Sequence, residues 1–147
     1  MTKALHIHRV PVAAVPKAIR VPECAALMSR GLRAAREDNL TRVVAELMTD
    51  HRQLWLAFGQ GKPALMACWT TEIKEDDGVR WVCVSALAGS NLRAWIGKMV
   101  EHMLAWAAKE DCAHVRWAGK QGWRRAVKNA RVVGTHDGEA LFERAVV

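Results

Sequence analysis

The chain has 147 residues, of which 51% are hydrophobic and 25% charged, and its formal net charge is +7. This length suits one ordinary globular domain, and the composition excludes an intrinsically disordered chain. No apolar run approaches the roughly 20 residues that cross a membrane. The N-terminus lacks the continuous apolar segment of a signal peptide, so we expect a cytoplasmic protein.

Cysteine and histidine spacing argues against a metal site. The four cysteines lie far apart in the sequence and form no Cys-x-x-Cys pair. We expect them to be buried, reduced thiols, because free cysteine behaves as a small hydrophobic residue. His6 and His8 form a close pair, but no second pair accompanies them. The sequence therefore predicts no bound metal.

The first third of the chain predicts one strand followed by two helices. Weak alternation at its start is typical of a strand, and Pro22 with Glu23 is typical of a first helical turn. Gly31 is expected to weaken the helix that follows. The predicted elements are a strand over residues 3–15, a helix beginning at 21–23, and a helix from 39–41 to 50–51.

Hydrophobic periodicity then changes from that of helices to that of strands. Three apolar runs follow one another, separated by Gly-containing turns at residues 59–63 and 74–78. Short apolar runs joined by such turns are typical of an antiparallel meander. The predicted strands cover residues 54–58, 64–73 and 79–87.

A long amphipathic helix is the clearest prediction in the chain. From residue 92 to 110 apolar side chains recur at alternating spacings of three and one, which is a continuous apolar stripe. With the strands at 79–87 and 114–118 it forms a βαβ unit, so these two strands should be parallel. A short helix over 121–129 and a hairpin of strands 131–133 and 141–144 complete the chain.

This order, (β)ααβββαβαββ, resembles the GNAT acetyltransferase fold over nearly the whole chain, as a single α/β domain spanning residues 1–147 with a mixed sheet. The amino-acid sequence of residues 88–134 is also similar to that of small GNAT-like proteins of tailed bacteriophages. The shared features are a Gly turn, a helix with W…WA, a Cys, an apolar strand and a segment like GKQGWRR. The resemblance implies that acetyl-CoA lies between two splayed strands, with its pyrophosphate at the N-terminus of the long helix.

The residues that correspond to the family's pyrophosphate loop depart from its pattern. GNAT enzymes carry (Q/R)xxGx(G/A), whose glycines let backbone N–H groups approach phosphate. Here the segment holds a single glycine, so we expect weaker binding, with Arg93 adding positive charge. The candidate cofactor-binding residues are Leu87, Ala88, Gly89, Ser90, Asn91, Leu92 and Arg93.

Candidate catalytic residues are few. The family commonly places a Glu on the meander strands as base and a Tyr near the end of the chain as acid. This chain has no Tyr. Glu72 is the candidate base on the sheet, although a surface charge at a strand end is the simpler interpretation. Ser85 and Cys83 are substitutes that strand alternation also explains.

A basic segment follows the strand at 114–118. Its cations, together with Trp117 and Trp123, suggest contact with nucleic acid or another partner, whereas a solvated surface is the simpler interpretation. The remaining tryptophans are expected in the core. The candidate contact residues are Lys120, Arg124, Arg125, Lys128 and Arg131.

Three functions remain open. The sequence favours a catalytically degenerate, phage-type GNAT-fold protein that is virion-associated or accessory, in the host cytoplasm or the particle, with phage structural proteins or packaged DNA as partners. The altered loop and the absent Tyr favour it. The alternatives are an active acetyl-CoA-dependent N-acetyltransferase and a basic nucleic-acid-binding protein. No membrane partner is expected, and the sequence is compatible with either a monomer or an oligomer.

Overall fold

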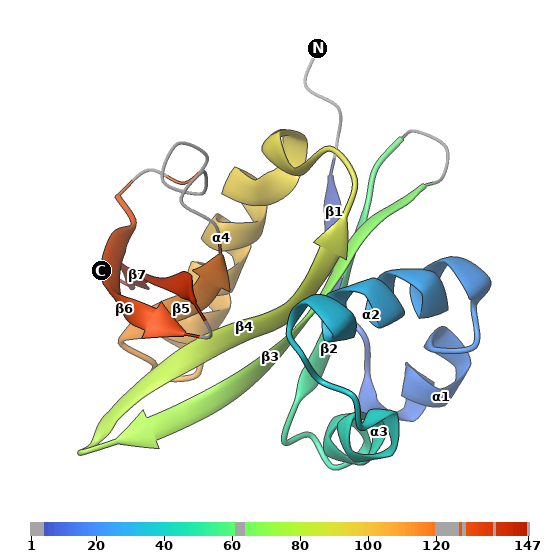
Figure 1. Cartoon of the computed structure of the whole chain (residues 1–147), viewed down its shortest axis with the longest axis horizontal. Helices are drawn as coiled ribbons and strands as arrows, with labels where there is room; N and C mark the ends of the chain where they lie inside the picture. The colour runs from blue at the N-terminus through green and yellow to red at the C-terminus, as the bar shows by residue number, and fades with distance from the viewer. Residues whose placement is uncertain (1–4, 61–63, 120–126, 128, 137, 147) are drawn as a thin grey trace. The chain divides into compact units, whose positions relative to one another are not determined.

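The computed structural model describes residues 5–60, 64–119, 127, 129–136 and 138–146. Seven strands form one mixed sheet in the order β1-β2-β3-β4-β5-β7-β6 (Figure 1), which confirms the α/β class. The strands are β1 His6–Arg9, β2 Gln53–Phe58, β3 Leu65–Asp76, β4 Val79–Gly89, β5 His114–Gly119, β6 Arg131–His136 and β7 Glu139–Ala145. The helices are α1 Val15–Ala18, α2 Pro22–Ala34, α3 Leu40–Met48 and α4 Leu92–Lys109, with a 3-10 turn at Val12–Ala14.

The predicted first strand over residues 3–15 is wrong in its second half. β1 ends at Arg9, and a 3-10 turn and α1 follow it. Pro11 precedes the turn with a φ of −58°, and Pro16 lies in the first turn of α1. Proline lacks the N–H that a strand ladder needs but is well suited to a first helical turn.

The two predicted helices are confirmed. α2 has Pro22 in its first turn and buries Cys24, Met28, Gly31 and Leu32. α3 begins after Asn39, whose side-chain Oδ1 accepts a hydrogen bond from the backbone N–H of Arg42 at 3.0 Å. This bond satisfies a helix N–H that has no partner within the helix, which is why asparagine is favoured there.

The predicted meander is confirmed, with a shorter second turn. Residues 74–76, expected in that turn, belong to β3. The turn consists of Asp77 and Gly78, with φ values of +50° and +77°. Two successive positive φ values make a tight hairpin turn that matches the twist of the flanking strands. β3 and β4 are therefore longer than the apolar pattern indicated.

Contacts group the chain into two compact units. The first contains the chain up to Glu72 together with Ser85–Asn91, and the second contains Ile73–Val84 and the chain from Leu92 onward. In the first unit α2 and α3 pack on the sheet through a hydrophobic core that includes Val43, Leu47 and Leu54.

In the second unit, β4 and β5 are parallel, as the βαβ prediction required. Their ladder runs from Trp81↔His114 to Val84↔Trp117. The apolar stripe of α4 is buried as predicted, at Trp95, Ile96, Met99, Val100, Met103, Leu104 and Ala107.

The predicted roles of three tryptophans in the second unit are wrong. Trp117 was expected to contact a partner, but it is 2% exposed and stacks on Phe142 with ring centroids 5.7 Å apart. Trp81 and Trp106 were expected in the core, but both are only half-buried. Strand alternation explains Trp117 and Trp81, because neighbouring residues of a strand face opposite sides of the sheet. Trp106 lies beside the buried stripe of α4 and not within it.

The end of the chain forms the predicted hairpin of β6 and β7, extended at both strands. β7 also pairs with β5, so it lies between β5 and β6. The predicted helix over residues 121–129 falls mostly outside the described residues.

None of the four cysteines forms a disulfide within the described residues. Cys24, Cys68 and Cys112 are buried as expected, whereas Cys83 is half-buried. Within the described part of the chain, no helix combines the length and apolarity needed to cross a membrane.

Candidate functional site

The candidate site begins where β4 departs from regular strand geometry. Among the described residues, the ladder with β5 ends at Val84↔Trp117, whereas β4 continues to Gly89. Ala86 has a φ of +51°, a conformation that residues with a β-carbon rarely adopt. Such a residue locally disrupts a strand in the manner of a bulge. The segment Ser85–Gly89 therefore carries backbone groups that do not pair with β5.

A buried arginine lies close to this segment within the first unit. Arg52, just before β2, is 1% exposed. Its Nη1 and Nη2 donate to the two carboxylate oxygens of Glu37 at 2.7 and 2.6 Å, and its Nε donates to Oγ1 of Thr70 at 2.9 Å. A two-pronged guanidinium–carboxylate pair is strong and fixes orientation. Arg52 is thus held in one geometry.

Ser85 completes this network on β4. Arg52 Nη2 donates to Ser85 Oγ at 3.3 Å, and Thr70 Oγ1 lies 3.0 Å from the same hydroxyl. Thr70 also donates to the carbonyl oxygen of Ser85 at 3.2 Å. Because Ser85 directly precedes Ala86, the network holds the irregular part of β4 in place through both backbone and side chain.

Two further carboxylates lie at the edge of the network. Oε1 of Glu72 is 4.0 Å from Arg52 Nε, and Oε1 of Glu46 is 3.9 Å from Arg52 Nη1. Burial lowers the pKa of Arg52, but the hydrogen bond and charge of Glu37, together with the charges of Glu72 and Glu46, outweigh it and raise that pKa. The guanidinium therefore stays charged, and carboxylates outnumber it.

The structure brings together two of the three candidate catalytic residues. Glu72 and Ser85 both lie against Arg52. The Glu72 side chain is 31% exposed, and within the described residues its carboxylate makes that ion pair but no hydrogen bond. Cys83 is half-buried on the part of β4 that belongs to the second unit.

Three residues of the network, Arg52, Glu37 and Thr70, were not predicted as site residues from the sequence. One signal was present for Arg52, since it stands two residues before the continuous apolar run LWLAF. An arginine so placed must either reach water or find a buried partner.

The candidate pyrophosphate loop keeps one feature and loses another. α4 begins at Leu92, so a helix N-terminus follows the loop, and Arg93 is exposed. However, the backbone N–H of Ser90 donates to the carbonyl oxygen of Met66 at 3.0 Å. That N–H is committed to the sheet and is not available to a phosphate. Asn91 adopts a φ of +54° at the turn into the helix.

Most of the predicted basic contact segment, namely Lys120, Arg124, Arg125 and Lys128, lies outside the described residues. Arg131 begins β6, and its 70% exposed side chain pairs with Glu143. Within the described residues, no three His, Cys, Asp or Glu side chains are grouped to hold a metal ion.

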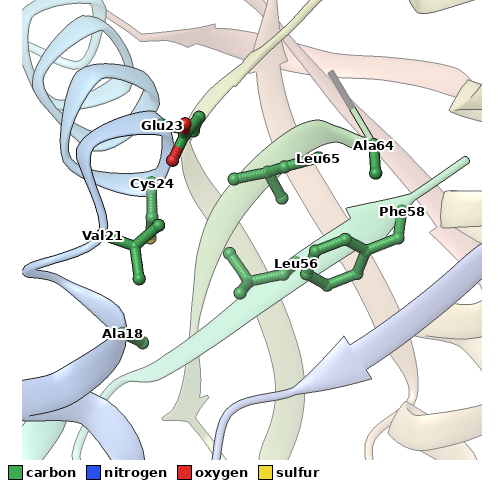
Figure 2. A pocket seen from close by; sticks show the side chains of 8 residues that line it. All are labelled: Ala18, Val21, Glu23, Cys24, Leu56, Phe58, Ala64 and Leu65. Carbon is green, nitrogen blue, oxygen red and sulfur yellow. The ribbon is translucent and has the colours of Figure 1, made fainter. Parts of the chain in front are cut away.

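An apolar pocket of about 490 Å³ also lies in the first unit. Figure 2 shows Val21 and Cys24 facing Leu56 and Leu65 across it. Glu23 supplies the one carboxylate among its described lining residues. The pocket is at the N-terminal end of α2, whereas Glu37 follows the C-terminal end of that helix, so the pocket is separate from the Arg52 network.

Several solved structures with a similar fold are acetyltransferases. A probable acetyltransferase from Staphylococcus epidermidis matches with a TM-score of 0.65 and 15% identity, covering 98% of this chain and 100% of its own. Aminoglycoside 6'-acetyltransferase type Ii matches with a TM-score of 0.63 and 12% identity, covering 97% of each chain. A predicted acetyltransferase from Clostridium acetobutylicum, solved with acetyl-CoA, matches with a TM-score of 0.57 and 8% identity, covering 84% of this chain and 86% of its own.

No protein-family model and no curated protein matches the sequence. The structural matches show that the chain has the GNAT fold. At these identities the matches carry the fold alone, and the chemistry has to be argued from the residues of the site.

Proposed function

We propose that this protein is an acyl-CoA-dependent N-acyltransferase. The observation that carries the proposal is the end of the β4–β5 ladder at Val84↔Trp117, directly before Ser85 and the positive φ of Ala86. A buried network centred on Arg52 supports that irregular backbone. A rare backbone conformation is retained when its surroundings hold it firmly, and it is found most often at functional sites.

The described residues fit part of an acyl-CoA molecule. Backbone groups of Ser85–Gly89 that do not pair with β5 can hydrogen-bond to the amides of the pantetheine arm, as an added strand would. The N-terminus of α4 and Arg93 offer positive charge to the phosphates. Because the Ser90 N–H is already committed to Met66, we expect weak phosphate binding. When bound, acyl-CoA supplies the thioester-linked acyl group.

Glu72 is the side chain we assign to proton transfer. An amine nucleophile must lose a proton, and a carboxylate within hydrogen-bonding reach can accept it. Glu37 has both oxygens occupied by Arg52, whereas the partly exposed Glu72 has no hydrogen bond within the described residues. Ser85, held by Arg52 and Thr70, positions the neighbouring backbone.

A second function is favoured by three specific observations. The loop before α4 has a single glycine and a committed Ser90 N–H, and the chain has no Tyr to act as an acid. A GNAT-fold protein that has lost catalysis and serves as an accessory or virion-associated binding protein would show these features. The two functions differ in whether acetyl-CoA is bound and consumed.

The test combines binding and turnover. Purified protein is heated with and without millimolar acetyl-CoA, and CoA release is followed by chromatography with a panel of primary amines. We expect acetyl-CoA to raise the melting temperature, because a ligand that binds the folded state stabilises it. We expect amine-dependent CoA release that falls about 100-fold or more in Glu72→Gln.

Glu75→Gln is the matched control, since Glu75 is an exposed carboxylate three residues further along β3. It should retain the activity of the unmodified protein. Absence of both stabilisation and CoA release would contradict the acyltransferase and favour the accessory protein. Turnover that Glu72→Gln leaves unchanged would refute the role assigned to Glu72.

A further inference from the structure

A buried carboxylate in the second unit holds two arginines side by side. Glu143 on β7 is 1% exposed and lies opposite Arg116 on β5 and Arg131 on β6 in the strand registers. Arg116 Nε donates to Oε2 of Glu143 at 2.6 Å, and Arg131 Nη2 donates to Oε1 at 2.5 Å. Three neighbouring strands (Figure 1) therefore bring two guanidinium groups to one carboxylate.

Arg116 is fixed on a second side by an aromatic ring. Its guanidinium carbon lies 4.5 Å from the ring centroid of Trp81 on β4. A cation over an indole face is attracted by the ring and loses side-chain freedom. With Nε bound to Glu143 and the guanidinium carbon over the Trp81 ring, Arg116 is held in place before any ligand arrives, which lowers the entropic cost of binding.

The terminal nitrogens of Arg116 remain available to a ligand. Among the described residues, its hydrogen bond to Glu143 uses Nε, and none uses Nη1 or Nη2. The Arg116 side chain is 27% exposed and that of Arg131 is 70% exposed. On β5 the residues beside Arg116, Val115 and Trp117, are buried and face the opposite side of the sheet.

The cluster carries surplus positive charge. Two guanidinium groups face a single carboxylate, and Nδ1 of His114 lies 3.6 Å from Oε1 of Glu143. A site with more cations than anions, and with unused guanidinium donors, is complementary to an oxyanion.

We propose that Arg116 and Arg131 form a binding site for a single oxyanion group, either a carboxylate or a phosphate, on a small ligand. The geometry suits one group because the two arginines converge on the same carboxylate instead of being spread along a surface. A nucleic-acid backbone calls for several cations in a row. The site lies on β5, β6 and β7, and it does not depend on acyl transfer.

The experiment follows the side-chain Nε–Hε signals of the arginines by nuclear magnetic resonance. The full chain is titrated separately with inorganic phosphate, with glutarate and with a short DNA duplex at constant ionic strength. We expect saturable shifts of the Arg116 and Arg131 signals with at least one of the two small anions, and the stronger of the two identifies the preferred group. Saturation by DNA with no response to either small anion would overturn the proposal.

Three variants separate binding from folding. Arg131→Gln removes one of the two arginines that pair with Glu143, while Arg116 still pairs with that carboxylate, so the variant should remain folded and bind the preferred anion about tenfold more weakly. Arg116→Lys keeps the charge but loses the planar fork, and should also weaken binding. Arg144→Gln is the matched control, because within the described residues the side chain of Arg144 pairs with Glu101 on α4 and not with Glu143. Equal affinity in all three variants would refute the site.

Discussion

Gly31 on α2 and Ala86 on β4 approach so closely that no other residue fits at position 31. A β-carbon on Gly31 would lie 2.1 Å from the carbonyl oxygen of Ala86 and 2.6 Å from its carbonyl carbon. The obstructing atoms are backbone, so they cannot move aside as the end of a flexible side chain could. The glycine that was expected only to weaken α2 thus lets the helix pack against the irregular part of β4.

Gly31→Ala should therefore destabilise the protein by about 2 to 3 kcal/mol, because added volume in a tightly packed contact forces the backbone apart. Gly97→Ala is the opposite case, since a β-carbon there meets nothing within 4 Å. In the middle of α4 that change should stabilise by about 0.5 to 1 kcal/mol through helix propensity. Urea unfolding of both variants measures the difference, and destabilisation of equal size in both would contradict the contact.

Arg52→Met should cost about 2 to 4 kcal/mol of unfolding free energy, since it removes the buried guanidinium that donates to the carboxylate of Glu37 and to the hydroxyls of Thr70 and Ser85. Glu37 is 32% exposed, so water can recover part of that loss. Arg42→Met is the surface control. The Arg42 side chain is 76% exposed, and its Nε lies 3.6 Å from Oε1 of Glu46. The unfolding free energy of Arg42→Met should therefore change by no more than about 0.5 kcal/mol. Similar losses in the two variants would argue against a structural network.

Glu143 should make stability depend on acid pH. Burial raises the pKa of its carboxyl, but the hydrogen bonds of Arg131 and Arg116 and the nearby charge of His114 outweigh burial and bring the pKa below the ordinary value of 4.5. A carboxyl with a depressed pKa in the folded state stabilises the protein above its unfolded-state pKa. That stabilisation is lost as the pH falls through the folded-state value.

At neutral pH the unfolding free energy of Glu143→Gln should accordingly be about 1 to 3 kcal/mol lower than that of the unmodified chain. This difference in unfolding free energy should become smaller as the pH falls below about 4.5. Thermal unfolding from pH 3 to 7 provides the comparison. Glu101→Gln, which removes an exposed carboxylate paired with Arg144, should differ little in stability from the unmodified chain at every pH in this range. A stability difference between Glu143→Gln and the unmodified chain that stays constant with pH would show that Glu143 has the same pKa in the folded and unfolded states.

The four thiols should differ in reactivity. Burial raises the pKa of Cys68 to about 12, with the neighbouring Cys24 adding to the rise and Arg30 offsetting part of it. Because the thiolate is the nucleophile, Cys68 should be inert in the folded protein. Cys83 is the half-buried cysteine of the four and should react first with a thiol reagent at pH 8. Cys83→Ser should abolish the fast phase, and an unchanged fast phase would locate it elsewhere.

The amino-acid sequence by itself determined the elements whose side-chain pattern is local. The apolar stripe of α4, the alternation of the meander and the Pro22 start of α2 each depend on residues within one or two turns of one another, so periodicity revealed them. The same locality allowed the βαβ unit and the GNAT order to be predicted. It failed at residues 12–18, where Pro11 and Pro16 turned weak alternation into helix.

Only the tertiary structure decided what the candidate site contains. Glu37, Arg52, Thr70 and Ser85 come from separate parts of the chain, and no spacing rule connects them. The same holds for the insertion of β7 between β5 and β6, which brings Glu143 to two arginines. Burying a charge is costly unless partners surround it, so these residues acquire their roles from neighbours that the fold supplies. Short-range periodicity in the sequence predicts helices and strands, whereas buried charged networks depend on contacts between residues far apart in the chain.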